Sequence, residues 1–387
     1  MKPKSFIRAA AASSLVAGLA VTASALGAGA ATHNRDFEPS QESHALFVET
    51  ESPTGNHVLS YSRASDGTIS FDGSYATGGF GATAVGASAD PIASQDGLTL
   101  INNNSELVAT NSGSDTVTVF AVDGTRLIWL QQVGSQGEFP VSVASHGDLV
   151  SVVNAGGVGS LAQFRLFGDF LVSQGVQVRS LGLGLTNTNP PDFHHGVGEV
   201  AYTPNGQHLI IATKLSTNSF DVFSVGFNGA LGATPVVTHS NFALPFAFTF
   251  DSAGRVVSAE ASNSSVNTYT VNANGSLTSL GTVSDGFLAL CWISGANGYF
   301  YGSNSGSGNV SSFDENGAGA PQLVNATAAT AHAGDIDSVV SPDGQTLYVE
   351  SGVAGTVDAY SIGAGGSLTQ LETIFNIPVA SEGIAAS

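Results

Sequence analysis

The chain has 387 residues and a formal net charge of −20, and glycine alone occupies 48 positions. With 30 acidic against 10 basic residues, the composition disfavours nucleic acids and anionic membranes as partners, because both are bound through basic patches. The single cysteine, Cys291, excludes an intrachain disulfide, and beside Trp292 in an apolar segment it is expected to be a small buried residue.

The first 30 residues have the composition of a signal peptide. A basic start (MKPKSFIR) precedes an alanine-rich apolar stretch, and residues 28–30 (AGA) offer a small-residue cleavage site. This stretch contains few large apolar residues, which argues against a transmembrane anchor. We therefore expect secretion with cleavage near Ala30, followed by a flexible lead-in over 31–43. Cleavage would change the net charge to −23, since the 10 basic residues fall to 7 against 30 acids.

From residue 44 onward the chain repeats one pattern of short strands. Each copy has an apolar anchor at the start of a strand, and successive anchors lie 44 to 59 residues apart. The anchors are Val58, Val117, Leu161, Phe220, Val266, Val310 and Val357. Turn sequences precede most of them, and SPDG at 341–344 is the clearest, because proline presets the second position of a type I turn. A period in the forties with about four strands is typical of a β-propeller blade, so seven anchors predict seven blades.

The two ends of the repeat region fit together. Blade one begins near residue 45 with a sequence that matches the second strand of the other repeats, so its inner strand is missing. The last residues, 381–387 (SEGIAAS), follow blade seven and resemble a lone inner strand. We therefore predict an all-β fold over 44–387, a seven-bladed β-propeller whose first blade is completed by the C-terminal strand, which removes the open edges. A frayed C-terminal tail is the alternative.

No nucleotide-binding, zinc-ligand, EF-hand or nucleophile-elbow motif occurs in the sequence, so neither a cofactor nor a metal is predicted. A site is expected where equivalent positions of the blades converge, at the channel mouth. Counting six or seven residues back from the anchors gives Glu51, Asn111, Asn154, Lys214, Glu260, Asn304 and Glu350. Asparagine suits this turn position, so Lys214 and Glu260 stand out in neighbouring blades four and five. They could form an inter-blade ion pair, or orient a substrate and exchange protons.

Further titratable residues precede the inner strands of two blades. The segment PPDFHHGVGEV (190–200) contains His194 and His195, and only one of them would face the channel, because adjacent strand residues point to opposite faces. Imidazole titrates near neutral pH and suits proton transfer, although a lone histidine is more often structural. Blade seven has His332, Asp335 and Asp337 at its entry, without the spacing of a calcium loop.

The repeats resemble a known family. The segments SPDGQTLYV and GTVDAYSI, and the GSLT elements at 275–278 and 366–369, are similar to those of the seven-bladed lactonase family, over about residues 44–387. That family includes bacterial 6-phosphogluconolactonase-type proteins and fungal carboxymuconate cyclases, and other extracellular propellers share its YVTN-type repeats. The resemblance implies a catalytic histidine before the inner strand of blade four, matched by the His194–His195 pair, and a glutamate in blade five, matched by Glu260.

The chain also departs from the family pattern. Phe246 stands where the resemblance implies an arginine. In blade six the resemblance implies one basic residue near Cys291, where the segment ALCWIS has none, and another at position 305, where this chain has Ser305. Arginine clamps carboxylate and phosphate groups with two parallel hydrogen bonds, so its loss disfavours a phosphorylated substrate. The predicted site consists of His194, His195 and Glu260 as catalytic residues and Lys214, Asn154, Asn304, Glu350 and Phe246 as substrate-binding residues.

Two functions remain open on this basis. One is a secreted lactonase-like enzyme that hydrolyses, or forms, an uncharged or weakly acidic lactone at the channel mouth. The other is a non-catalytic extracellular propeller that binds a protein or a cell-envelope ligand. For both, we expect a monomer without nucleic-acid binding or membrane insertion.

Overall fold

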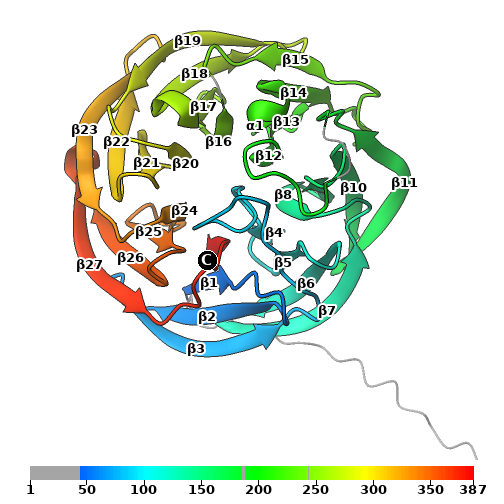
Figure 1. Cartoon of the computed structure of the whole chain (residues 1–387), viewed down its shortest axis with the longest axis horizontal. Coiled ribbons are helices and arrows are strands. Elements are labelled where there is room, and N and C mark those ends of the chain that lie inside the picture. Colours follow the sequence, from blue (N-terminus) through cyan, green and yellow to red (C-terminus); the bar gives the residue numbers. More distant parts are fainter. Residues whose placement is uncertain (1–43, 185–187, 243) are drawn as a thin grey trace, which may run out of the picture. The chain divides into compact units, whose positions relative to one another are not determined.

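The computed structural model describes residues 44–184, 188–242 and 244–387. They form seven four-stranded antiparallel sheets arranged as the blades of a ring (Figure 1). Strands make up 55% of the chain and helices 3%, so the predicted all-β, seven-bladed β-propeller is confirmed. The predicted signal peptide (1–30) and lead-in (31–43) lie outside the described residues.

The strands of each blade are given from the channel outward. Blade one contains β28 (Ile384–Ala386), β1 (Ala45–Glu49), β2 (His57–Arg63) and β3 (Ile69–Ala76). Blade two contains β4 (Leu98–Ile101), β5 (Glu106–Asn111), β6 (Thr116–Asp123) and β7 (Arg126–Gly134). Blade three contains β8 (Pro140–His146), β9 (Leu149–Asn154), β10 (Ser160–Phe167) and β11 (Phe170–Ser180). Blade four contains β12 (Glu199–Tyr202), β13 (His208–Ala212), β14 (Ser219–Ser224) and β15 (Val236–His239).

The remaining three blades follow the same order. Blade five contains β16 (Pro245–Phe250), β17 (Val256–Glu260), β18 (Ser265–Val271) and β19 (Leu277–Ser284). Blade six contains β20 (Leu290–Ala296), β21 (Tyr299–Asn304), β22 (Asn309–Glu315) and β23 (Pro321–Thr330). Blade seven contains β24 (Asp335–Val340), β25 (Thr346–Ser351), β26 (Thr356–Ile362) and β27 (Leu368–Phe375). Short helical turns are α1 (Lys214–Thr217), η1 (Ala261–Asn263) and η2 (Ala364–Gly366).

The C-terminal strand closes the ring as predicted. Strand β28 pairs antiparallel with β1 through Leu46↔Ala386 and Val48↔Ile384. Arg63 adds a side-chain bond to this closure, because its Nη1 donates to the carbonyl oxygen of Ser387 at 2.8 Å. The edge of β1 that would otherwise face the channel is therefore paired, and the alternative of a frayed tail is wrong.

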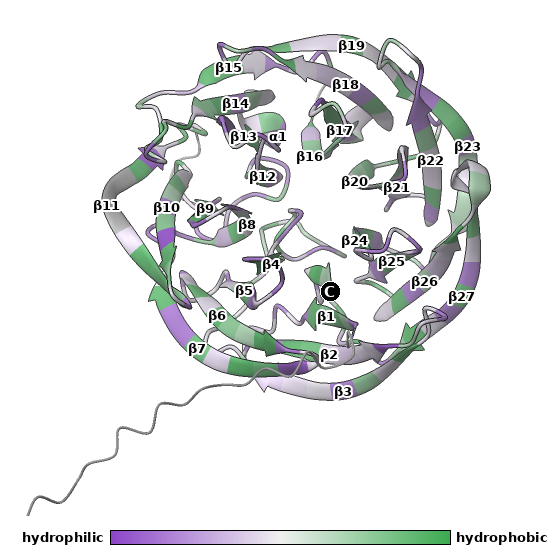
Figure 2. Cartoon of the chain, turned by 180° about the vertical axis from the view of Figure 1, so that it is seen from behind, coloured by the Kyte–Doolittle hydropathy of each residue, from purple (hydrophilic) through white to green (hydrophobic). Residues whose placement is uncertain are grey.

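The repeat anchors form the core between blades. All seven are fully buried, which explains why an apolar residue recurs at this position. At the interface of blades four and five, the Phe220 ring lies edge-on to Phe248 and Tyr269, with ring centroids 6.2 and 5.2 Å apart. Every residue of the middle strand β25 is buried, whereas the outermost strand β27 mixes polar and apolar residues, which Figure 2 shows as changes of colour along it.

Two long loops meet over the channel. We call the end of the ring where the inner strands of blades two to seven begin the upper face, and we call residues 82–97 the crossing loop, which Figure 1 shows in the centre of the ring before β4. Val85 of this loop forms a parallel bridge with Asp192, in the entry loop of blade four. Both loops lie within the two longest gaps of the repeat, between anchors 58 and 117 and between anchors 161 and 220.

The crossing loop is hydrogen bonded to blades on all sides. The Ser94 hydroxyl donates to Val141 O of blade three at 2.8 Å, and Gln95 N donates to Gly198 O beside blade four at 2.9 Å. On blade six, the Gln95 side chain pairs with both backbone groups of Ile293. These bonds fix the loop across the channel. Among the described residues, no helix is long and apolar enough to cross a membrane.

Glu382 joins the ring closure to the crossing loop, and its removal should be costly. Its carboxylate accepts the backbone N–H groups of Ile92, Ala93 and Ser94 at 2.7, 3.3 and 3.1 Å. In Glu382→Ala these buried donors lose their acceptor, at about 1–3 kcal/mol for each unsatisfied group. We expect a clearly lower thermal unfolding midpoint, and a larger loss when residues 381–387 are deleted, both measured by circular dichroism.

Asp123→Ala is the matched control, because Asp123 is an exposed carboxylate at the end of β6. This surface change should alter stability by no more than about 0.5 kcal/mol. A truncated protein with the midpoint of the full-length chain would contradict the role of β28.

Candidate functional site

The two predicted histidines lie on an exposed turn at the upper face, just before β12. The backbone N–H of His194 donates to Asp192 Oδ1 at 3.0 Å, and the N–H of His195 donates to Asp192 O at 3.1 Å. The imidazole Nδ1 of His195 lies 2.8 Å from Asp192 Oδ1, and the two side chains are 45% and 44% exposed. An imidazole that is oriented by a carboxylate and still reached by water is therefore present at this face.

The charge of Asp192 is stabilised by this turn. Partial burial alone would raise the pKa of the Asp192 carboxyl, but the hydrogen bonds from His195 and from the His194 N–H outweigh burial and keep that pKa below its usual value. The carboxylate is therefore ionised at neutral pH and accepts the proton on Nδ1 of His195. The Nε2 atom of the neutral imidazole is then left with its lone pair, which is the form that accepts a proton.

The histidine turn is fixed from two sides. The parallel bridge to the crossing loop holds Phe193, whose N–H donates to Val85 O at 3.0 Å. On the other side, Leu215 N donates to His194 O at 3.0 Å, and the Ser216 hydroxyl donates to His195 O. Both donors belong to α1, so the helical turn supports the backbone of the histidine pair.

Lys214 lies below this turn and is only 1% exposed. Its Nζ donates to Phe193 O at 2.7 Å and to Ala93 O at 2.9 Å, and it lies 5.3 Å from the centre of the Phe246 ring. Burial lowers the pKa of Lys214 to about 8, against the opposing influence of the Asp90 and Glu382 charges. Lys214 and Phe246, two predicted substrate-binding residues, are thus in contact, and the ammonium group joins the crossing loop to the histidine turn.

Glu260 is fully buried inside blade five. Its carboxylate accepts the hydroxyl of Ser240 at 2.5 Å and the hydroxyl of Tyr269 at 2.9 Å, and burial raises its pKa to about 7. The predicted pairing of Lys214 with Glu260 is not formed among the described interactions. In blade five, Glu260 lies opposite Ser265. The residue of blade four equivalent to Ser265 is Ser219, and it lies opposite Thr213. Lys214 is therefore one residue beyond the position equivalent to Glu260, and it begins α1.

Glu350 was also assigned to the wrong register. It pairs with Val357, whereas Ser351 pairs with Thr356 and occupies the position equivalent to Glu260. Glu350 is fully buried, and burial together with the charges of Asp337 and Glu382 raises its pKa well above the usual value. The physical reason is that the loop length after the second strand varies between blades, so a count of residues does not give the pairing.

Asn154 and Asn304 occupy the expected ring position and support their own blades. The Asn154 amide donates to Ser135 O at 3.3 Å and to the Ser160 hydroxyl at 3.2 Å. The Asn304 amide donates to the Ser311 hydroxyl at 2.9 Å. Both asparagines are fully buried, so in this structure their amides hold turns together, as the composition of this position indicated. Cys291 is buried as expected, and burial raises the pKa of its thiol.

A cavity of about 370 Å³ occupies the channel below the crossing loop, lined by the inner strands of blades two to seven. Two carboxylates that sequence reasoning missed line it, Asp96 of the crossing loop and Glu199 at the start of β12. Burial raises the pKa of Asp96 to about 7 and that of Glu199 well above its usual value. Among the described residues, no group of three or more His, Cys, Asp or Glu side chains is arranged to hold a metal ion.

Comparison with known proteins supports the fold. No protein-family profile matches the chain, and no curated protein matches it by sequence. Among solved structures, a putative 6-phosphogluconolactonase from Bacteroides fragilis has a TM-score of 0.67 at 16% identity and covers 90% of this chain and 98% of its own. The periplasmic gluconolactonase of Pseudomonas aeruginosa has a TM-score of 0.68 at 18% identity, with 89% and 98% covered. At such identities the likeness shows a shared seven-bladed fold, in agreement with the resemblance of the repeats.

The raised carboxyl pKa values predict a protein that is most stable in mildly acidic solution. The pKa values of Glu260, Glu382 and Asp96 are raised to about 7. Between the ordinary carboxyl pKa and about 7, the folded state holds protons that the unfolded chain has already released. The stability that these three groups contribute is therefore complete at a pH below the ordinary carboxyl pKa, and it is lost as the pH rises through about 7. We expect the thermal midpoint to rise by several degrees when the pH is lowered from 8 to 5.

Glu260→Gln should make this pH dependence shallower, because it removes one of the titrating groups, whereas the exposed Asp123→Asn should leave it unchanged. Calorimetric scans at several pH values give the comparison. A midpoint that rises with pH in this window would contradict the prediction.

Proposed function

We propose that the protein is an exported, lactonase-like hydrolase that opens an uncharged or weakly acidic lactone at the upper face. The observation that carries this proposal is the Asp192–His195 pair, with Nδ1 bound to an ionised carboxylate and the imidazole half exposed. The shared fold agrees with it, since two similar structures bear the names putative 6-phosphogluconolactonase and periplasmic gluconolactonase.

In the proposed reaction His195 acts first as a base and then as an acid. A water oxygen attacks the lactone carbonyl carbon, and the water proton passes to Nε2 of His195. The ring C–O bond then breaks, and the imidazolium returns this proton to the departing ring oxygen, which yields the hydroxy acid. Asp192 stabilises the imidazolium and keeps the ring in position. Proton transfer of this kind contributes about 10²–10⁴-fold to a rate.

The surroundings of the pair favour a substrate without a phosphate group. Lys214 is buried and donates to two carbonyl groups, so its charge is not presented to solvent. Phe246 takes the position at which the resemblance implies an arginine, and its ring packs on Lys214 and on Trp292, with ring centroids 4.8 Å apart in the latter case. Among the described residues around the pair, an anionic group would find no arginine to clamp it. In this proposal Glu260 supports blade five and does not touch the substrate.

The activity is tested by a pH-stat screen of neutral five- and six-membered lactones on the purified protein without residues 1–30. His195→Gln should lower kcat/KM on the order of 100-fold, because the general base is removed. Asp192→Asn should lower kcat and displace the pH profile, because the carboxylate no longer sets the tautomer.

His332→Gln is the matched control, since His332 forms a similar pair with Asp358, with Nδ1 to Oδ2 at 2.8 Å and 40% side-chain exposure. It should retain activity, and so should Glu260→Gln when assayed below its unfolding temperature. If no lactone in the screen is opened, the enzymatic proposal fails and the non-catalytic binding alternative stands. Loss of activity in Glu260→Gln with retention in His195→Gln would assign the chemistry to blade five instead.

Export is a separate part of the proposal and rests on the composition of the first 30 residues. Expression in a secreting bacterial host should yield extracellular protein whose N-terminus lies near residue 31. Intact-mass spectrometry of the culture supernatant measures this directly. An exported protein that still carries Met1 would contradict the cleavage.

A further inference from the structure

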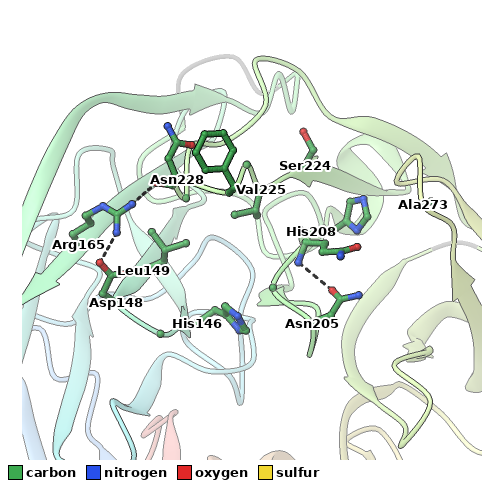
Figure 3. Close-up of a pocket in the computed structure, with 16 residues that line it drawn as sticks. His146, Asp148, Leu149, Arg165, Asn205, His208, Ser224, Val225, Asn228 and Ala273 are labelled. Atoms are coloured by element: carbon green, nitrogen blue, oxygen red, sulfur yellow. Dashed lines mark hydrogen bonds and ion pairs between the residues drawn. The ribbon is translucent and has the colours of Figure 1, made fainter.

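A groove at the lower face lies at the opposite end of β12 from the histidine turn. It lies among the turns that follow β8, β12 and β14 of blades three and four and has a volume of about 990 Å³ (Figure 3). A second hollow of about 290 Å³ shares Asn205, Gln207 and His208 with it and continues along the turn after β16. The two hollows together form an elongated depression across blades three to five.

The groove is electrically neutral although the chain is strongly acidic. Its one arginine, Arg165, forms an ion pair with Asp148 and also donates to Asn228 O, and Figure 3 shows these three residues together on one side. The guanidinium is thereby occupied within the protein. The remaining polar side chains of the lining are amides, imidazoles and a serine hydroxyl. A strongly charged ligand would therefore find no unpaired countercharge among the lining residues.

The amide groups in the groove are oriented and still have donors to offer. The Asn205 side-chain oxygen accepts the Thr203 hydroxyl at 2.8 Å and Gln207 N at 3.0 Å, and the Asn228 side-chain oxygen accepts Ala230 N at 3.1 Å. These bonds fix the oxygen of each amide, so each NH₂ group has a defined direction and no partner among the described residues. The side-chain amide of Gln207 likewise has no hydrogen-bond partner among the described residues.

An aromatic ring stands beside these donors. Phe227 lines the groove and is fully exposed at the tip of the turn after β14. The His146 imidazole is half-buried in the middle of the groove and lies at 6.0 Å, centroid to centroid, from the Tyr202 ring. An exposed phenyl group offers a flat apolar face, while the amides and imidazoles nearby offer directed hydrogen bonds.

We propose that this lower groove binds a neutral oligosaccharide. The C–H face of a sugar ring packs on the Phe227 ring, and sugar hydroxyl oxygens accept hydrogen bonds from the amides of Asn205, Gln207 and Asn228. The elongated shape fits several linked sugar units. A sulfated or phosphorylated glycan would need the Arg165 guanidinium, which is already paired, and a lipid chain would need apolar walls in place of the amide-rich lining.

Isothermal titration of the protein without residues 1–30 with two neutral probes, cellohexaose and hexa-N-acetylchitohexaose, tests this site. At least one probe should bind, with an affinity that is the same at low and high salt, since no charges are paired on binding. Phe227→Ala should weaken that affinity about tenfold or more, and Gln207→Ala should also weaken it. Both side chains are at the surface of turns, so the thermal midpoint should be unchanged.

Phe71→Ala is the matched control, because Phe71 is 62% exposed on the outer strand of blade one, away from the groove. It should leave the affinity unchanged. The proposal is overturned if neither probe binds, if Phe71→Ala weakens binding as much as Phe227→Ala, or if a heparin hexasaccharide binds instead in a salt-dependent manner. His195→Gln should bind the probes normally, so this site and the proposed hydrolase can fail independently.

Discussion

The upper half of the channel depends on the hydrogen bonds that the Glu382 carboxylate accepts from the crossing loop. This carboxylate lies next to β28, the strand that completes blade one, and it accepts three consecutive N–H groups of the crossing loop. The C-terminal segment therefore does two things at once. It pairs the edge of β1, and it fixes a loop that starts from blade one and reaches blades three, four and six.

The placement of the histidine turn follows from that loop. Val85 of the crossing loop pairs with the backbone around Asp192, and Lys214 donates to carbonyl groups of both segments. The Asp192–His195 contact joins residues only three positions apart, but its position at the channel mouth also depends on contacts that lead back to the C-terminal segment.

The cost of this arrangement is the burial of carboxyl groups. Glu49, Glu350 and Glu382 are completely buried at the closure of blades seven and one, and burial raises the pKa of each. Lys214 is the one buried cation whose charge acts on Asp90 and Glu382 among the described residues. The described residues at this closure thus include more buried acids than ion pairs neutralise, and protonation is the less costly way to accommodate them. The Asp192 carboxylate differs because its side chain is 44% exposed, so burial raises its pKa less than its hydrogen bonds lower it.

The sequence by itself determined the number of blades, the buried anchors and the closure by the last residues, because a repeat of short strands and turns is written in local residue patterns. The structure places the two loops that meet over the channel within the two longest gaps between anchors, and nothing local in the sequence showed that they pair. The partners of Lys214, Glu260 and Glu350 were decided only by the tertiary structure. The loop between Thr213 and Ser219 is one residue longer than the equivalent loop between Glu260 and Ser265. Lys214 therefore lies one residue beyond the position equivalent to Glu260, under the crossing loop. Which carboxylates lose their water depends on side chains from other blades, and that information appears only when the ring is closed.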